Sequence, residues 1–348
     1  MKVLVTGHHG YIGSVLAPVL RAAGHEVVGL DTFFYAGCDF GPHDAFRPSR
    51  ALDLRDVTTS DLRGFDAIVH LAALSNDPVG DLNPDWTFAI NRDATVTLAR
   101  AAREAEVRRF VFASSCSMYG AADGDVALDE CAPLRPLTPY AESKVSAEEE
   151  LRALAVEGFS PVSMRNATVY GVSPRLRLDI VLNNLVAWAH TTGAIRMQSD
   201  GTPWRPLVHV QDVARAALVL LDAPEEAVSG EAFNVGSAEQ NYRIRELAEI
   251  VHDRLPECTI AFAEGAAPDP RSYRVDFSKL EATFPDFRCE WTAERGADEL
   301  ARAYAAADLS AGELDGYRYI RLGQIKRLRD SGALDDDLRW ANERAFTS

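Results

Sequence analysis

The chain has 348 residues, of which 47% are hydrophobic and 25% charged, a composition typical of a soluble globular enzyme. The formal net charge of −16 at pH 7 argues against a nucleic-acid surface or an anionic-membrane binder. No apolar stretch reaches the ~18 residues of a membrane span, and the start has no signal-peptide form. We therefore expect a cytoplasmic protein. The five cysteines are scattered and lack metal-ligand spacing, which indicates a reducing compartment and no structural metal: Cys38, Cys116, Cys131, Cys258 and Cys289.

Short apolar strands alternate with helical patterns over the first 165 residues. The expected strands are residues 2–6, 26–30, 67–71, 109–113 and 162–165. The expected helices are residues 11–23, about 85–105 and about 140–157. Alternation of this kind predicts an α/β fold, a Rossmann-type doubly wound parallel sheet with helices on both faces.

After Gly171 the alternation breaks. Helical patterns cover residues 180–191, 243–254 and about 292–307, a strand runs into a helix within 207–221, and a short strand covers 233–235. Residues 268–274 form a charged loop, and the tail after residue 309 holds a polar helix that we expect to cover the substrate part. We predict a doubly wound domain of residues 1–171 plus about 205–235. A smaller interleaved C-terminal part then takes about 172–204 and 236–348.

A glycine-rich turn, TGHHGYIG at residues 6–13, joins the first strand to the first helix. Gly7 permits the tight turn, Gly10 lets the backbone approach a pyrophosphate, and Gly13 allows the helix to pack closely on the strand. Tyr11 and Ile12 complete the predicted cofactor contacts, where the helix N-terminus faces the anion. The strand–turn–helix context favours dinucleotide binding over a purely structural turn.

A carboxylate, Asp31, follows the second strand eighteen residues past Gly13. It would accept hydrogen bonds from the adenosine ribose and repel a 2′-phosphate, and no arginine follows it, so NAD is favoured over NADP. Asp53 and Leu54, after a third short strand, are expected beside the adenine. His8 and His9 lack further ligands at suitable spacing, and adjacent histidines in a strand point to opposite faces, so we expect no metal site.

Tyr140 and Lys144 are one helical turn apart and share a helix face. Lys144 is one of only four lysines in the chain. An ammonium beside a phenol favours the phenolate, so we expect the pKa of Tyr140 to fall from about 10 towards neutrality. That would make Tyr140 a general acid/base for a sugar or alcohol hydroxyl. Ser115 comes just after the strand 109–113, at the sheet edge where ligands of such folds bind, although it could be a simple loop hydroxyl.

The chain resembles an extended short-chain dehydrogenase/reductase of the nucleotide-sugar epimerase/dehydratase family. The matching pieces fall in the family's order: TGHHGYIG, Asp31, HLAA at 70–73, Asn91, SSCSMYG at 114–120, YAESK at 140–144, RPLVHVQD at 205–212 and FNVGS at 233–237.

The resemblance implies a role for each matching position. Ser115, Tyr140 and Lys144 would be the catalytic residues, with Lys144 also holding the nicotinamide ribose. Further cofactor contacts would come from Leu71, Ala72, Ala73 and Asn91. The substrate, a nucleotide-diphosphate sugar, would be bound by Ser75, Cys116, Ser117, Thr168, Arg205 and Arg271, although Arg274 competes with Arg271 for its role.

Departures from the family's typical residues narrow the range of reactions that we expect. Dehydratases typically place an Asp-Glu pair where this chain has Cys116 and Ser117, and decarboxylases tend to carry a glutamate at position 117. A 3,5-epimerase would typically have a cysteine at 117 rather than 116. Thr168 replaces a common asparagine, which leaves the nucleotide open.

The leading hypothesis is therefore an NAD-dependent C4 epimerase acting through a transient 4-keto sugar. The alternative is a ketoreductase or dehydrogenase on a similar sugar. Less favoured are a 3,5-epimerase, a dehydratase and a non-catalytic NAD-binding scaffold. We also expect a homodimer, through a four-helix bundle made by the helices at about 85–105 and 140–157.

Overall fold

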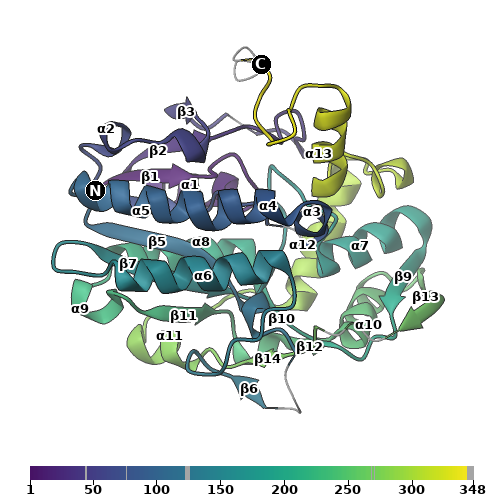
Figure 1. The fold of residues 1–348 in the computed structure, drawn as a ribbon. Helices are drawn as coiled ribbons and strands as arrows, with labels where there is room; N and C mark the ends of the chain where they lie inside the picture. Colours follow the sequence, from purple (N-terminus) through teal and green to yellow (C-terminus); the bar gives the residue numbers. More distant parts are fainter. Residues whose placement is uncertain (44, 76, 122–125, 268, 270, 343–348) are drawn as a thin grey trace.

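A parallel β-sheet forms the centre of the computed structural model, which describes residues 1–43, 45–75, 77–121, 126–267, 269 and 271–342 (Figure 1). Its strands lie in the order β11-β7-β5-β4-β1-β2-β3 and all pair in parallel. They are β1 Lys2–Thr6, β2 Glu26–Asp31, β3 Ser49–Ala51, β4 Ala67–His70, β5 Arg109–Ser115, β7 Ser160–Asn166 and β11 Ala232–Val235. The strand order reverses at β1: β2 and β3 lie on one side of it, and β4, β5, β7 and β11 on the other. Such a reversal opens a crevice at the carboxyl ends of β1 and β4.

Helices cover both faces of the sheet because its strands are apolar on both sides. Val3 and Val5 belong to the cluster that packs on α1 and α8, whereas Leu4 belongs to the cluster under α5 and α6. This alternation follows the two-residue period of a strand. The covering helices are α1 Gly13–Ala22, α8 Val210–Asp222, α5 Ala94–Glu104 and α6 Pro139–Ala153, with the short α2 Thr59–Leu62, α9 Glu225–Val228 and α11 Ser278–Thr283. The predicted Rossmann-type α/β fold is confirmed.

The prediction of one continuous helix for about 85–105 is wrong, because the helical segment is interrupted. The structure has α4 Pro84–Thr87, a π-helical segment Phe88–Asp93 and then α5. The wider π turn turns Asn91 inward, where its side chain accepts a hydrogen bond from Leu74 N (2.8 Å) and donates one to Leu74 O (3.1 Å). π-Helical segments of this kind occur frequently at functional sites.

The second part of the chain has its own core beside the carboxyl ends of the sheet (Figure 1). Its strands form three small sheets: β8 Thr168–Tyr170 with β10 Trp204–His209 and β12 Asn241–Arg243, β9 Ala194–Ser199 with β13 Thr259–Ala267, and β6 Ala127–Leu128 with β14 Arg274–Val275. Its main helices are α7 Val181–Thr192, α10 Ile244–Arg254 and α12 Ala293–Ala306. Of the predicted loop 268–274, residues 268 and 270 lie outside the described residues.

Shorter elements complete the described chain. They are α3 Asp77–Leu82 and the 3-10 turns Leu54–Asp56, Cys116–Tyr119, Ala238–Gln240 and Ala311–Glu313. No helix in the described ranges combines the length and the apolarity needed to cross a membrane.

The C-terminal tail, residues 310–342, contains the predicted helix, α13 Arg321–Asp330, but the helix does not cover the substrate part as expected. Leu314 and Tyr319 pack with the second part, and the chain then crosses to the first. There Ile325 and Leu328 join a core cluster with Phe34 of the loop after β2. The apolar positions of α13 are thus buried against the N-terminal half, which sequence periodicity alone could not assign. Residues 343–348 lie outside the described ones.

Close packing at the glycine-rich turn gives a stability prediction. A Cβ on Gly13 would lie 2.2 Å from Gly7 O and 2.6 Å from His8 Cα, both backbone atoms that cannot move aside cheaply. We expect Gly13→Ala to lower the free energy of unfolding by about 3 kcal/mol or more. In Gly312→Ala, where the added Cβ would lie 3.9 Å from Ser310 Oγ, the change should stay within ~0.5 kcal/mol. Urea unfolding of both variants measures the difference, and equal midpoints would contradict this packing.

Candidate functional site

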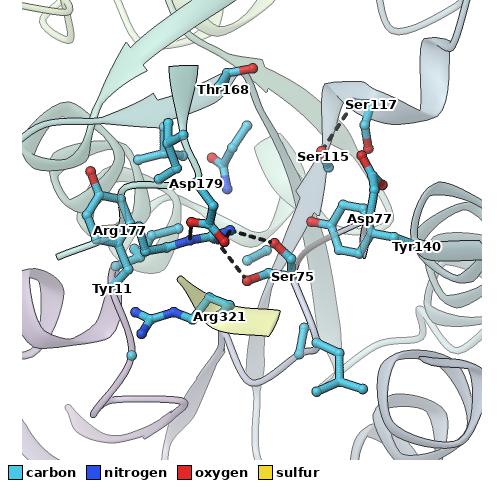
Figure 2. A pocket seen from close by; sticks show the side chains of 18 of the residues that line it. Tyr11, Ser75, Asp77, Ser115, Ser117, Tyr140, Thr168, Arg177, Asp179 and Arg321 are labelled. Carbon is cyan, nitrogen blue, oxygen red and sulfur yellow. Dashed lines mark hydrogen bonds and ion pairs between the residues drawn. The ribbon is translucent and has the colours of Figure 1, made fainter. Parts of the chain in front are cut away.

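A cavity of about 840 Å³ lies at the carboxyl ends of β1, β2, β4 and β5, between the sheet and the second part of the chain (Figure 2). Its size is typical of cofactor and ligand sites. The structure brings most of the predicted residues together in its walls: Gly7, Gly10, Tyr11, Ile12, Gly13, Asp31, Asp53, Leu54, Leu71, Ala72, Ala73, Ser75, Ser115, Ser117, Tyr140, Lys144, Thr168, Arg205 and Arg271. Asn91 and Cys116 are not among the lining residues.

The glycine-rich turn carries the chain from β1 into α1 along one wall of the cavity. Gly7 has φ +73°, and a Cβ there would lie 2.7 Å from Ala72 N, so this position needs glycine. The N-cap of α1, Ile12, makes no side-chain cap, and the first turn holds no acidic residue. The first N–H groups of α1 are therefore suited to an anion in the cavity.

Carboxylates mark the end of the cavity beside β2 and β3. Asp31 accepts hydrogen bonds from His9 N (3.0 Å) and Phe33 N (2.8 Å), which fix its orientation. Asp53 is held by Arg55, whose Nη2 lies 2.7 Å from Oδ2. Burial opposes ionisation of Asp53, but the hydrogen bonds from Arg55 outweigh it and lower the pKa of the carboxyl. A dinucleotide fits this arrangement, with ribose hydroxyls at Asp31 and phosphates at the turn.

Tyr140 and Lys144 come from the first turns of α6. Thr138 caps this helix through Ala141 N (3.2 Å), which sets the helix start at Pro139 and points Tyr140 into the cavity. Lys144 Nζ donates to Ala113 O (2.7 Å), at the end of β5, and lies 5.8 Å from the centroid of the Tyr140 ring. Ser115 follows two residues later on the same strand. Figure 2 shows Ser115, Ser117, Asp77 and Tyr140 grouped on one side of the cavity.

The pKa of Tyr140 corrects the expectation drawn from the spacing. Burial of the phenol, together with the charge of Asp77, raises its pKa to about 12, although a hydrogen bond with Ser115 and the charge of Arg177 act in the opposite direction. Burial lowers the pKa of Lys144 to about 7. With the protein's own groups alone, desolvation outweighs the lysine, so the expected shift towards neutrality is wrong.

A buried polar layer lies behind β5 and includes one of the predicted residues, Cys116. Arg165 forms an ion pair with Glu148, which also accepts from Ser114 Oγ (2.9 Å). Cys116 Sγ donates to Arg165 O (3.0 Å), and burial raises the pKa of this thiol well above its ordinary value. The substrate contact predicted for Cys116 is therefore not supported, because its side chain faces this layer instead of the cavity.

Asn91, predicted to contact the cofactor, lies behind the cavity wall. Its amide binds both backbone groups of Leu74 and donates to Ser143 Oγ of α6 (3.3 Å). It thus joins the 71–74 loop to the helix that carries Tyr140. Asn91 acts as a positioning residue in this geometry.

The arginines predicted for the sugar nucleotide meet at the other end of the cavity. Asp269 joins them: it accepts from Arg205 Nη2 (2.8 Å) and from Arg271 Nε (3.0 Å). Arg271 also binds Asp77, and its pKa stays above its ordinary value because of Asp269. Arg274 lies instead with its guanidinium 4.9 Å from the Trp204 ring centroid and is not a lining residue. The geometry favours Arg271 over Arg274.

Sequence reasoning missed several lining residues. Arg177 and Asp179 form a buried ion pair (2.8 Å) in the loop before α7, and Arg321 enters the cavity from the tail. Asn166 was also missed; its Oδ1, like the Oγ of the predicted Ser117, is buried without a hydrogen-bond partner among the described residues, and both residues line the cavity. Of the missed residues, only Asn166 carried a sequence signal, because it directly follows the predicted strand 162–165 at the ligand-binding edge. In the described ranges, no group of three or more His, Cys, Asp or Glu could hold a metal ion.

Comparison with known proteins gives a consistent result. The model of the NAD dependent epimerase/dehydratase family matches residues 3–236. The UDP-glucose 4-epimerase of Corynebacterium glutamicum is 30% identical over 272 residues, which cover 73% of this chain and 80% of that protein.

Two solved structures share the fold over almost their whole length. MoeE5 in complex with UDP-glucuronic acid and NAD is 29% identical with a TM-score of 0.75, over 88% of this chain and 99% of that one. DesIV, a dTDP-glucose 4,6-dehydratase from Streptomyces venezuelae with NAD and TYD bound, is 28% identical with a TM-score of 0.74, over 88% and 97%. Both solved structures contain NAD, and the named reactions of the similar proteins include a 4-epimerisation and a 4,6-dehydration.

The lowered pKa of Lys144 predicts a pH dependence of stability in protein stripped of nucleotide. The native lysine loses its proton above about pH 7, whereas the unfolded one keeps it to about pH 10.4. Unfolded chains therefore bind more protons in this window, and the free energy of unfolding should rise with pH, by up to about 1.4 kcal/mol per unit.

Lys144→Met should remove this contribution between pH 7 and 9, measured by urea unfolding. Lys326→Met, at an exposed position of α13, should leave the wild-type slope. The same slope in all three proteins would show that Lys144 keeps an ordinary pKa in the fold.

Proposed function

We propose that this chain, which belongs to the NAD-dependent epimerase/dehydratase family, inverts the C4 configuration of a nucleotide-diphosphate sugar through a transient 4-keto sugar. One observation carries the proposal: a single cavity joins the glycine-rich turn, the phenol of Tyr140 and the pair Arg205 and Arg271. A dinucleotide and a sugar nucleotide could therefore both reach the phenol at once.

Each residue has a role in this reaction. NAD, held by the turn at residues 7–13 and by Asp31, supplies a hydride acceptor and, when oxidised, a positive charge. Tyr140 takes the proton of the C4 hydroxyl and later returns it as a general acid. Ser115 donates a hydrogen bond to the same oxygen, and the Lys144 ammonium favours the phenolate over the phenol.

The arginine pair would hold the sugar nucleotide while the keto sugar turns its other face to the reacting carbon. Arg205 and Arg271 are already oriented by Asp269, so little rotamer freedom is lost when phosphates bind. Binding energy gained at the pyrophosphate, away from the reacting carbon, would keep the intermediate in the site. Thr168, Ser75 and Ser117 supply hydroxyls for the nucleotide sugar.

Elimination of water is disfavoured because no carboxylate follows Ser115. The carboxylate that does line this side of the cavity, Asp77, accepts from Thr138 Oγ1 (2.8 Å) and pairs with Arg271. Both of its oxygens thus already have partners within the protein. Ser117 stands where a dehydratase or decarboxylase would need an acid.

The reaction is tested by offering purified protein a panel of UDP-, dTDP- and GDP-hexoses. The expected result is the C4 epimer with no net formation of NADH. Stoichiometric production or consumption of NADH would favour the dehydrogenase or ketoreductase alternative, and deuterium uptake at C3 or C5 from heavy water would indicate a 3,5-epimerase. No epimer from any donor would overturn the proposal. Homodimerisation through α5 and α6 stays a prediction.

Loss of one phenol oxygen gives the most specific mutational test. Tyr140→Phe should lower kcat for epimerisation by at least about 100-fold, because the general acid/base is removed, while NAD binding measured by calorimetry changes little. Tyr304→Phe is the matched control, since it removes a buried hydroxyl that donates to Asn183 O (3.1 Å) outside the cavity. It should keep its activity. Near-normal turnover in Tyr140→Phe would exclude the phenol from the chemistry.

A further inference from the structure

The C-terminal tail brings a buried cation into the cavity. Arg321, the first residue of α13, is 4% exposed and lines the cavity. In Figure 2 its side chain lies on the same side as Tyr11, Arg177 and Asp179, away from Tyr140. This guanidinium comes from a segment far in sequence from the glycine-rich turn.

The Arg321 guanidinium lacks the anionic partner that its neighbour has. Arg177 is bound at two points by Asp179 (2.8 and 3.2 Å). The Arg321 side chain donates to Arg175 O (3.0 Å) and lies 4.0 Å from the Tyr35 ring centroid, while only its backbone N–H reaches Asp179. Among the described residues, no carboxylate forms an ion pair with this guanidinium. Burial lowers the pKa of Arg321 and outweighs the charge of Asp179, which favours the protonated guanidinium. A buried charge without a directly paired counter-charge is costly, so the position is suited to a bound anion.

The anion site lies at the glycine-rich turn. Arg175 Nε donates to His9 Nδ1 of this turn (3.3 Å), and the Arg321 guanidinium donates to Arg175 O (3.0 Å), so Arg321 lies next to the turn through Arg175. The uncapped N-terminus of α1 contributes its N–H groups to the same region. The carboxylates Asp31 and Asp53 disfavour an anion further along the cavity.

The tail is fixed over the coenzyme half of the cavity by several contacts. Trp340 Nε1 donates to Thr32 O (2.6 Å), and Gln324 Nε2 donates to Phe34 O (2.9 Å). Arg55, which orients Asp53, also donates to Leu338 O (3.0 Å). The guanidinium of Arg321 is therefore held in place before any ligand arrives, which reduces the entropy lost on binding.

We propose that Arg321 binds the pyrophosphate of NAD, so that the C-terminal tail supplies part of the coenzyme site. The inference rests on the NAD dependence of the family and not on the sugar reaction proposed above. Its test can therefore fail or succeed whether or not the protein is an epimerase.

The experiment measures binding in nucleotide-stripped protein by calorimetry, with NAD, ADP, adenosine and UDP as probes. Arg321→Met keeps much of the side-chain volume but removes the charge. This substitution should lower the affinities for NAD and ADP about 10- to 100-fold. The affinities for adenosine, which has no phosphate, and for UDP should stay unchanged. Arg321→Lys should lower the affinity for NAD less than Arg321→Met does. Wild-type protein should also retain more dinucleotide after purification than Arg321→Met.

Arg327→Met is the matched control. Arg327 lies on the same helix, donates to Gln324 Oε1 (3.1 Å) and is not a lining residue, so all four affinities should match the wild type. Unchanged NAD and ADP affinities in Arg321→Met would overturn the proposal. An equal loss for adenosine would also overturn it, because the residue would then act only through folding. A loss confined to UDP would assign Arg321 to the substrate instead.

Discussion

Desolvation of Tyr140 and Lys144 is the constraint on which the rest of the site depends. Both side chains lie where α6 starts and β5 ends, and desolvation there makes each favour its neutral form: it raises the pKa of the phenol to about 12 and lowers that of the amine to about 7. The pair alone therefore does not bring Tyr140 into its phenolate form near neutral pH. The phenolate becomes accessible only with added positive charge, which an oxidised nicotinamide bound beside Tyr140 would supply. Reactivity would then be coupled to occupancy by the coenzyme.

Charge changes sign along the cavity, and this order would orient two ligands. Carboxylates Asp31 and Asp53 mark the end of the cavity beside β2 and β3, where the hydroxyl groups of an adenosine would bind. The α1 N-terminus and Arg321 provide positive charge at the middle, and Arg205 and Arg271 provide it at the far end. Tyr140 lies between the two positive regions, next to Asp77. Two pyrophosphates drawn to separate cationic regions would leave a nicotinamide and a sugar facing each other at the phenol.

Local patterns in the sequence predicted those parts of the site that depend on neighbours along the chain. The glycines at 7, 10 and 13, the carboxylate at Asp31 and the one-turn spacing of Tyr140 and Lys144 belong to this class. Cys116 was misassigned because the 3-10 turn after β5 directs it towards Arg165, a long-range contact. The pKa of Tyr140 depends on tertiary burial, which spacing does not encode. Arg321 could not be found at all, since it reaches the turn from more than three hundred residues away.

The most direct measurement is a crystal structure of the protein with NAD and an unreacted nucleotide-diphosphate sugar. It should show the Tyr140 hydroxyl at hydrogen-bonding distance, about 3 Å, from the C4 hydroxyl, with the nicotinamide ring against the same carbon. A complex with both ligands bound and the Tyr140 oxygen turned away from the sugar, or separated from the nicotinamide by the protein, would contradict the central claim.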